Sequence, residues 1–165
     1  MKHLFLIATM LTVSFASAQA FSGKDDKKLQ VGANFQNNAT GLNVSYDLGV
    51  GQNISLGFST TYALGIDEVD VIDSGFADCF DIRGRFNANL GNVLKIDDNF
   101  DVYPGLSFGL KNFGGHLGMR YFFSDGFGLY TELNTPLAKY DTGDLTAAEK
   151  LHNQFTISLG AVFNI

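Results

Sequence analysis

Apolar and polar residues alternate along most of the chain between Leu29 and Ile165, and this pattern predicts β-strands. Successive side chains of a strand point to opposite faces, so a period of two gives each strand one apolar and one polar face. The alternation falls into eight segments, at 29–35, 42–48, 54–64, 80–90, 102–110, 117–123, 127–133 and 155–165. We therefore expect an all-β protein with eight antiparallel strands.

The links between these segments fall alternately at two ends of the expected sheet. Links at 37–40, 65–78, 112–115 and 139–153 share one end, and links at 49–52, 91–100 and 124–126 share the other. The two longest lie at the same end, as in outer-membrane barrels, where outer loops are long and inner turns are short. An open sheet edge would leave backbone groups unpaired in a membrane, so we expect the first strand to pair with the last.

Periodicity alone fits two barrels of opposite polarity. A secreted or periplasmic lipocalin-like barrel would turn its apolar face inward and bind a small apolar ligand. A transmembrane barrel would turn the same face toward lipid and fill its lumen with the polar face. The chain also ends inside an alternating segment, QFTISLGAVFNI, similar to the terminal strand recognised by the outer-membrane insertion machinery. We therefore expect the transmembrane form, with Phe58, Phe86, Phe108 and Phe163 pointing outward.

The charges on the polar face predict a plugged lumen. The expected lumen charge network consists of Asp81, Arg83, Arg85, Arg120 and Glu132. A turn at 124–126 places residue 120 beside residue 130, so Glu132 lies on the adjacent diagonal, within reach of Arg120. We expect these two to form an ion pair, because opposite charges in a narrow lumen must neutralise one another. Eight strands leave an interior only wide enough for side chains, so we expect no channel.

Composition narrows the class of protein further. Of 165 residues, 17% are charged and 45% are hydrophobic, which excludes a disordered chain. Nineteen Gly and sixteen Phe favour strands and turns over helices. The net charge of −6 and a pI near 4.8 argue against nucleic acid as a partner. A mean hydropathy of +0.07 is acceptable for a barrel whose strands show only half their side chains to lipid.

The N-terminal segment MKHLFLIATMLTVSFASAQA is typical of an export signal. Lys2 precedes an apolar run of about 12 residues, short of the ~20 that a spanning helix requires. Cleavage fits after Ala16-Ser17-Ala18 or after Ala18-Gln19-Ala20. We expect residues 1–20 to be the signal peptide and 21–165 the barrel domain, and loss of Lys2 changes the charge from −6 to −7. Cys79 is the only cysteine, so no intrachain disulfide can form.

Three stretches carry a family resemblance: AQAFSGKDDKKLQVGANFQ, DVYPGLSFGLKNFGGHLGMRYFFSDGFGLYTE and LHNQFTISLGAVFNI. Along nearly its whole length the chain resembles a domain-of-unknown-function family of flavobacterial and related Bacteroidetes outer-membrane barrels, described as porin-like. Its architecture is similar to the eight-stranded barrels of the OmpX and OmpA-transmembrane type. The resemblance implies export and a barrel, and it supplies no catalytic residue.

An enzymatic alternative rests on three polar residues. Some outer-membrane barrels are lipid hydrolases, so Ser107, His116 and Glu132 are candidates for a catalytic triad. With a turn at 112–115, residue 107 pairs near residue 120, which puts His116 well beyond the ~3 Å required between nucleophile and base. We therefore expect no enzyme, and expect His116 to be a polar residue at the rim.

Both long links carry candidate features. The first contains an acidic loop of Asp67, Glu68, Asp70, Asp73 and Asp78. Clustered carboxylates attract divalent cations, but the spacing does not fit an EF-hand, so we expect a solvated loop and no metal site. The second, KYDTGDLTAAEKLHN, predicts one helical turn from Thr146, capped by Asp144 or Thr146, with Glu149 at capping-box spacing.

These observations predict an integral outer-membrane β-barrel with a side-chain-plugged lumen. We expect it to contribute to envelope structure or surface interaction through loops 65–78 and 139–153. Its expected partners are outer-membrane lipid and, during biogenesis, the insertion machinery. We expect a monomer with no cofactor. The lipocalin-like barrel and the lipid hydrolase are the alternatives.

Overall fold

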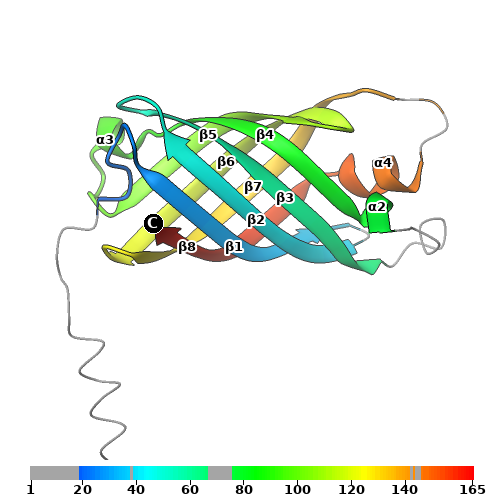
Figure 1. Cartoon of the computed structure of the whole chain (residues 1–165), viewed down its shortest axis with the longest axis horizontal. Coiled ribbons are helices and arrows are strands. Elements are labelled where there is room, and N and C mark those ends of the chain that lie inside the picture. The colour runs from blue at the N-terminus through cyan, green and yellow to red at the C-terminus, as the bar shows by residue number, and fades with distance from the viewer. Residues whose placement is uncertain (1–18, 38, 67–75, 142, 144–145) are drawn as a thin grey trace, which may run out of the picture.

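The protein is an antiparallel closed β-barrel of eight strands, seen in a computed structural model that describes residues 19–37, 39–66, 76–141, 143 and 146–165. The strands are β1 (Lys27–Gln36), β2 (Ala39–Gly49), β3 (Ile54–Ile66), β4 (Phe80–Ala88), β5 (Phe100–Gly109), β6 (Asn112–Ser124), β7 (Phe127–Lys139) and β8 (Thr156–Asn164). Each strand pairs with its neighbours in sequence, and β1 pairs with β8 to close the barrel (Figure 1). The predicted strand number and the closure are confirmed.

The two ends of the barrel differ in their connections. We call the end where β1 begins and β8 ends the terminal mouth, and it also carries the short helix α3 (Gly91–Leu94). The opposite end, the loop mouth, carries α2 (Phe76–Cys79) and α4 (Ala147–His152) (Figure 1). The predicted helical turn from Thr146 is confirmed, because Thr146 and Glu149 form a reciprocal capping box at the start of α4.

One predicted turn is wrong. The segment 112–115 lies inside β6, and the link from β5 to β6 is Leu110–Lys111, with Phe108 opposite Phe113. Glycines 114 and 115 resemble turn residues, but Gly114 faces a crowded interior: a Cβ there would lie 2.9 Å from the Ser107 hydroxyl. The glycine therefore serves close packing within a strand instead of a turn.

Polarity is reversed relative to a soluble domain. Phe58 and Phe108 on the outer wall are 48% and 62% exposed, whereas Arg85 and Arg120 are 4% and 1% exposed in the interior. Phe86 is also exposed, and Phe163 is half-buried beside the Phe127 ring, 5.7 Å between centroids. Among the described residues, no helix is long and apolar enough to cross a membrane.

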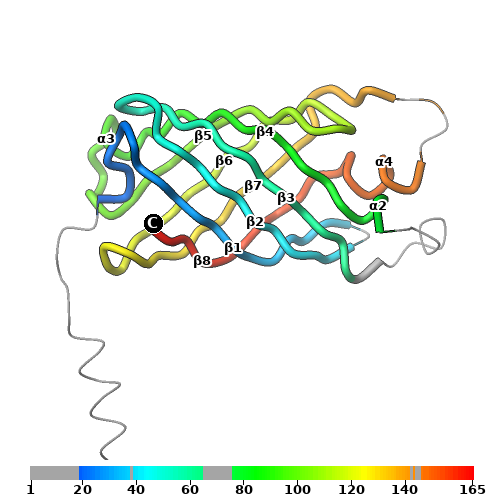
Figure 2. Tube along the Cα trace, in the orientation of Figure 1, coloured from blue at the N-terminus to red at the C-terminus, as the bar shows by residue number. Residues whose placement is uncertain are grey.

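One cluster of buried apolar side chains lies in the interior at the terminal mouth. Phe122, Tyr130 and Val162 are buried there and form a cluster with Ala20. In Figure 2 the chain before β1, drawn in blue, folds back at this end beside α3. The terminal mouth is therefore closed by the chain itself, ahead of the first strand.

Candidate functional site in the barrel interior

An arginine at the centre of the lumen joins strands that are not neighbours. Arg85 of β4 donates from Nη2 to Glu132 Oε2 of β7 at 2.6 Å. Its Nε lies 3.1 Å from Asp47 Oδ1 of β2, at an angle that makes an ion pair without a hydrogen bond. Both carboxylates are buried. The guanidinium therefore links three strands across the axis and closes the middle of the lumen.

A second arginine and an aromatic ring fill the space toward the terminal mouth. Arg120 Nη2 donates to Asp101 Oδ2 at 2.8 Å and to Asn89 Oδ1 at 2.9 Å. Its guanidinium lies 4.8 Å from the centroid of the Tyr103 ring, and that of Arg85 lies 5.8 Å from the same ring. Tyr103 is fully buried between two cations, an arrangement favoured by the negative face of the ring.

Glycine on the next strand makes room for this ring. Gly118 stands opposite Tyr103 in the β5–β6 register, and a Cβ on Gly118 would lie 2.0 Å from the Tyr103 ring. Gly105 does the same for His116, whose ring would lie 2.3 Å from a Cβ on Gly105. These two glycines are required by close approach of a ring.

The remaining ion pairs lie toward the two mouths. Arg83 Nε donates to Asp81 Oδ2 at 2.6 Å near the loop mouth, where Lys111 also lies 3.8 Å from Asp81. Lys28 donates to Asp26 at 2.6 Å near the terminal mouth. The interior therefore holds ion pairs along its whole length.

The charges of the interior balance. The cations are Lys28, Arg83, Arg85, Lys111 and Arg120, and the carboxylates are Asp26, Asp47, Asp81, Asp101 and Glu132. Every one of these groups belongs to at least one ion pair, so no member of the set is a lone buried charge. An unpaired buried charge would be strongly destabilising, and balance is what makes a charged interior tolerable.

The predicted pair of Arg120 and Glu132 is wrong in its partners. The register is as expected, with Arg120 opposite Tyr130, yet Arg120 pairs with Asp101 and Glu132 pairs with Arg85. Asp101 lies directly opposite Arg120 on the neighbouring strand β5, whereas Arg85 reaches Glu132 across the narrow lumen. Diagonal neighbours on one hairpin are therefore only one of several partners within reach.

The triad residues and His116 also lie elsewhere than expected. Ser107 is opposite Gly114, not near residue 120, and His116 is opposite Gly105. His116 is buried, so its expected place at the rim is wrong. Its Nε2 lies 2.6 Å from Asn87 Oδ1 and 3.4 Å from Arg85 Nη2, while Glu132 is bound to Arg85. Glu132 and His116 therefore both serve the central network.

A helical lid covers the loop mouth. Leu151 of α4 is fully buried and packs with Ala39 and Cys79. Arg83 Nη2 and Asn112 Nδ2 donate to the His152 carbonyl at 3.1 and 3.0 Å. Both donors bind the last carbonyl of the helix, and the Arg83 cation lies at the negative end of the helix dipole, where a positive charge is favourable.

Two titratable groups lie in this lid region, outside the strands. Burial lowers the pKa of His152, whose Nε2 donates to the Asp78 carbonyl at 2.9 Å. Burial, followed by the nearby Asp78 carboxylate, raises the pKa of the Cys79 thiol. Both shifts favour the neutral form of the group.

Little space remains between the lid and the central arginine. A polar cavity of about 20 Å³ lies there, with Arg83, Glu132 and His152 among its lining residues. About one water molecule fits a cavity of roughly that size. No group of three or more His, Cys, Asp or Glu residues able to hold a metal occurs in the described part of the chain. Of the acidic loop, Asp67, Glu68, Asp70 and Asp73 lie outside the described residues, and Asp78 belongs to α2.

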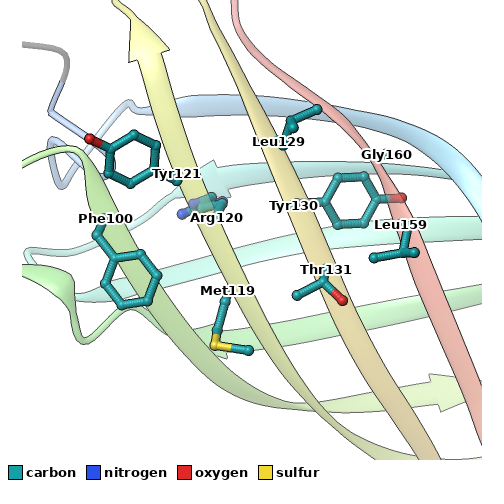
Figure 3. A pocket seen from close by; sticks show the side chains of 9 residues that line it. All are labelled: Phe100, Met119, Arg120, Tyr121, Leu129, Tyr130, Thr131, Leu159 and Gly160. Carbon is teal, nitrogen blue, oxygen red and sulfur yellow. The ribbon is translucent and has the colours of Figure 1, made fainter.

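An apolar hollow lies on the barrel wall toward the terminal mouth. It has a volume of about 650 Å³ and is formed over β5 to β8, with Phe100, Met119, Tyr121, Leu129 and Leu159 among its lining residues (Figure 3). Most of these side chains are exposed and apolar. The hollow is a shallow groove of the outer wall and has no charged group on its exposed surface, since Arg120 is buried in the lumen.

Sequence reasoning missed several members of the network. The predicted network lacks Asp47, Asp101, Lys28 and Tyr103, although each lies on the polar face when the alternation is continued to the ends of its strand. Lys28, for example, lies two residues before the inward Gln30, with the outward Leu29 between them, so it shares the inward face. The signal was thus present in the period of two, but the partner of each charge was not.

Comparisons with known proteins agree with this architecture. A family model described as "Family of unknown function (DUF6646)" matches residues 11–165. A solved structure titled "De novo design of transmembrane beta-barrels" has a TM-score of 0.58 and 9% identity to the chain, covering 87% of this chain and 98% of its own. At that identity the likeness shows the fold alone. No curated protein matches the chain.

Proposed function

We propose that this chain, which belongs to the DUF6646 family of unknown function, is an integral outer-membrane protein that seals its own lumen. In this proposal the barrel anchors the loop mouth at the cell surface, where loops 65–78 and 139–153 contribute to envelope structure or surface interaction. Outer-membrane lipid and the insertion machinery are its partners, and it acts as a monomer without enzymatic activity. A Bacteroidetes source and a specific similarity to barrels of the OmpX and OmpA-transmembrane type stay predictions.

The observation that carries the proposal is the polarity of the barrel. Large apolar side chains cover the outer wall on strands around the barrel, and balanced ion pairs fill the interior. In water this arrangement would expose the apolar wall and bury charges, both unfavourable. In a bilayer the same wall meets acyl chains, and the closed ladder satisfies the backbone.

Neither alternative is favoured by a specific observation. A lipocalin-like barrel needs an apolar cavity for its ligand, whereas the lumen is lined by charged and amide side chains and holds a cavity of about 20 Å³. A lipid hydrolase needs a nucleophile activated by a base, whereas His116 Nε2 lies on Asn87 and Arg85.

The decisive experiment is fractionation combined with surface proteolysis. A protease recognition sequence is inserted at Gly143 in one variant and at Gly126 in a matched variant, because these positions lie at opposite mouths. We expect both proteins in the outer membrane, with heat-modifiable gel mobility. Protease added to intact cells should cut only the Gly143 variant.

Two results would contradict the proposal. One is a mature protein that is monodisperse in buffer without detergent. The other is equal protection of both sites in intact cells together with equal cleavage after lysis, which would place the whole protein inside the envelope.

A further inference from the structure

The chain ahead of β1 is folded into the terminal mouth as tightly as the strands themselves. Ala20 and Phe21 are 1% and 2% exposed, as buried as the central arginines. Ala20 contacts Phe122, Tyr130 and Val162, all from inside the barrel. The Phe21 ring lies 5.9 Å below the guanidinium of Arg120. These two residues therefore form part of the interior packing.

Hydrogen bonds fix this segment to the loops of the same mouth. Ala20 N donates to the Asp98 carbonyl at 2.8 Å, and Asn92 Nδ2 donates to the Phe21 carbonyl at 2.9 Å. Farther along, Ser22 N donates to Asp26 Oδ2 at 3.0 Å. The chain is thus held from both of its sides before it enters β1.

The turn that follows depends on close approach. Gly23 has a φ of +94°, which favours glycine, and its carbonyl would lie 1.9 Å from a Cβ on Gly49. Asp25 N donates to the Gly49 carbonyl at 2.8 Å, and Gly49 N donates to Asp26 at 2.7 Å. The segment from 20 to 26 is therefore a built plug, which we call the N-terminal plug.

The sequence offers two cleavage positions, after Ala18 and after Ala20, and they leave this plug in different states. Cleavage after Ala18 puts the new α-ammonium on Gln19, whose side chain is exposed, and keeps every contact described above. Cleavage after Ala20 removes the hydrogen bond to Asp98 and puts the ammonium on Phe21, a residue that is 2% exposed. A buried charge with no partner of opposite sign is strongly unfavourable.

We infer that the export signal is removed after Ala18 and that the released end, starting at Gln19, closes the terminal mouth of the mature barrel. The inference rests on export to the outer membrane, as proposed above. It moves the expected start of the barrel domain from residue 21 to residue 19.

The test is the N-terminal sequence and intact mass of the protein purified from outer membranes. We expect a chain that begins at Gln19 or at the pyroglutamyl form that N-terminal glutamine produces. A chain beginning at Phe21 in the outer membrane overturns this inference and leaves the proposed function intact. An uncut chain that starts at Met1 and stays in the cytosol overturns both.

A pair of signal variants tests the role of the plug. Ala16→Leu removes the small residue needed for cleavage after Ala18 but leaves Ala18-Gln19-Ala20 intact, whereas Ala16→Ser keeps both motifs. We expect Ala16→Ser to start at Gln19. We expect Ala16→Leu to accumulate uncut precursor or to start at Phe21. Any barrel that starts at Phe21 should unfold at a lower temperature than wild type on heat-modifiable gels. An Ala16→Leu protein that starts at Phe21 and is as heat-stable as wild type overturns the plug.

Discussion

The outer wall and the interior are built by the same eight strands, yet they achieve stability in different ways. On the wall, Leu56, Phe58 and Leu106 are between 41% and 48% exposed. Acyl chains are fluid, so they can contact apolar side chains of different shapes. In the interior, Arg85 pairs with Asp47 and Glu132, and the Tyr103 ring packs against Gly118. The wall therefore depends on polarity, and the interior depends on individual partners.

Removal of one interior carboxylate should cause the largest loss of stability among the changes considered below. Glu132→Ala leaves Arg85 buried with only Asp47 within ion-pair distance, and breaking a buried pair destabilises by about 3–5 kcal/mol. The measurement is urea unfolding in lipid vesicles. Thr131→Ala, on the neighbouring outward position, is the control and should change stability much less. Equal losses in both variants would show that Glu132 has no special partner.

A charge on the wall tests the other half of the comparison. Phe58→Arg places a guanidinium in the apolar wall, and lipid-facing Arg costs about 2–4 kcal/mol at the bilayer midplane. The same unfolding measurement applies, with Phe58→Leu as a control that keeps the wall apolar. If Phe58→Arg unfolded like Phe58→Leu, the wall would be facing water.

Substitution of two glycines within strands, one facing the interior and one facing outward, compares the two faces directly. Gly118→Ala forces a methyl group against the Tyr103 ring, and overpacking of this kind costs about 1–3 kcal/mol. Gly84→Ala adds a methyl group where no atom lies within 4 Å, so we expect a change within about 0.5 kcal/mol. The difference between the two midpoints in urea is the readout. Similar midpoints would mean that the interior is as tolerant as the wall.

The lid at the loop mouth also depends on individual contacts, so a change in α4 should loosen the lid without unfolding the barrel. Thr146→Ala removes the cap of α4 and should weaken the lid by about 1 kcal/mol, which makes Cys79 roughly fivefold more reactive toward maleimide. Thr146→Ser keeps the hydroxyl and should react at the wild-type rate. Unchanged labelling in Thr146→Ala would show that α4 does not protect Cys79.

Acid should also open the lid, and we expect this effect to be the smallest of those predicted here. The pKa of His152 is lowered by burial, against the raising effect of Asp81, and Lys111 and Arg83 lower it further. An open lid thus binds a proton more readily, so lid stability is full above the ordinary His pKa of about 6.5 and falls as pH drops below it. Cys79 labelling, normalised to denatured protein at each pH, should rise in acid. His152→Gln should remove that rise, and an equal rise in both proteins would assign it to another group.

Most of the barrel was readable from the sequence because strands have an exact period of two. The eight segments, the pairing of β1 with β8 and the opposition of Arg120 to Tyr130 all follow from alternation and short links. Gly114 and Gly115 misled the reading, since a glycine that makes room in a strand looks the same in sequence as one that turns the chain.

For the interior, the sequence predicts which side chains face the lumen but not which of them pair. Alternation puts Arg85, Arg120 and Glu132 on one face, but pairing across a closed lumen joins residues far apart in sequence, such as 85 and 132. Likewise, nothing in the letters of residues 19–26 shows that this stretch is folded into the terminal mouth, because it has no period. Such contacts depend on the closed shape of the barrel.

The sequence by itself determined that the chain forms a barrel and which face of each strand is apolar, since both are local and periodic. Only the tertiary structure decided which charges meet, which glycines face a ring, and that Ala20 and Phe21 close one mouth while α4 closes the other. The reason is geometric: a narrow closed lumen brings distant strands within side-chain reach.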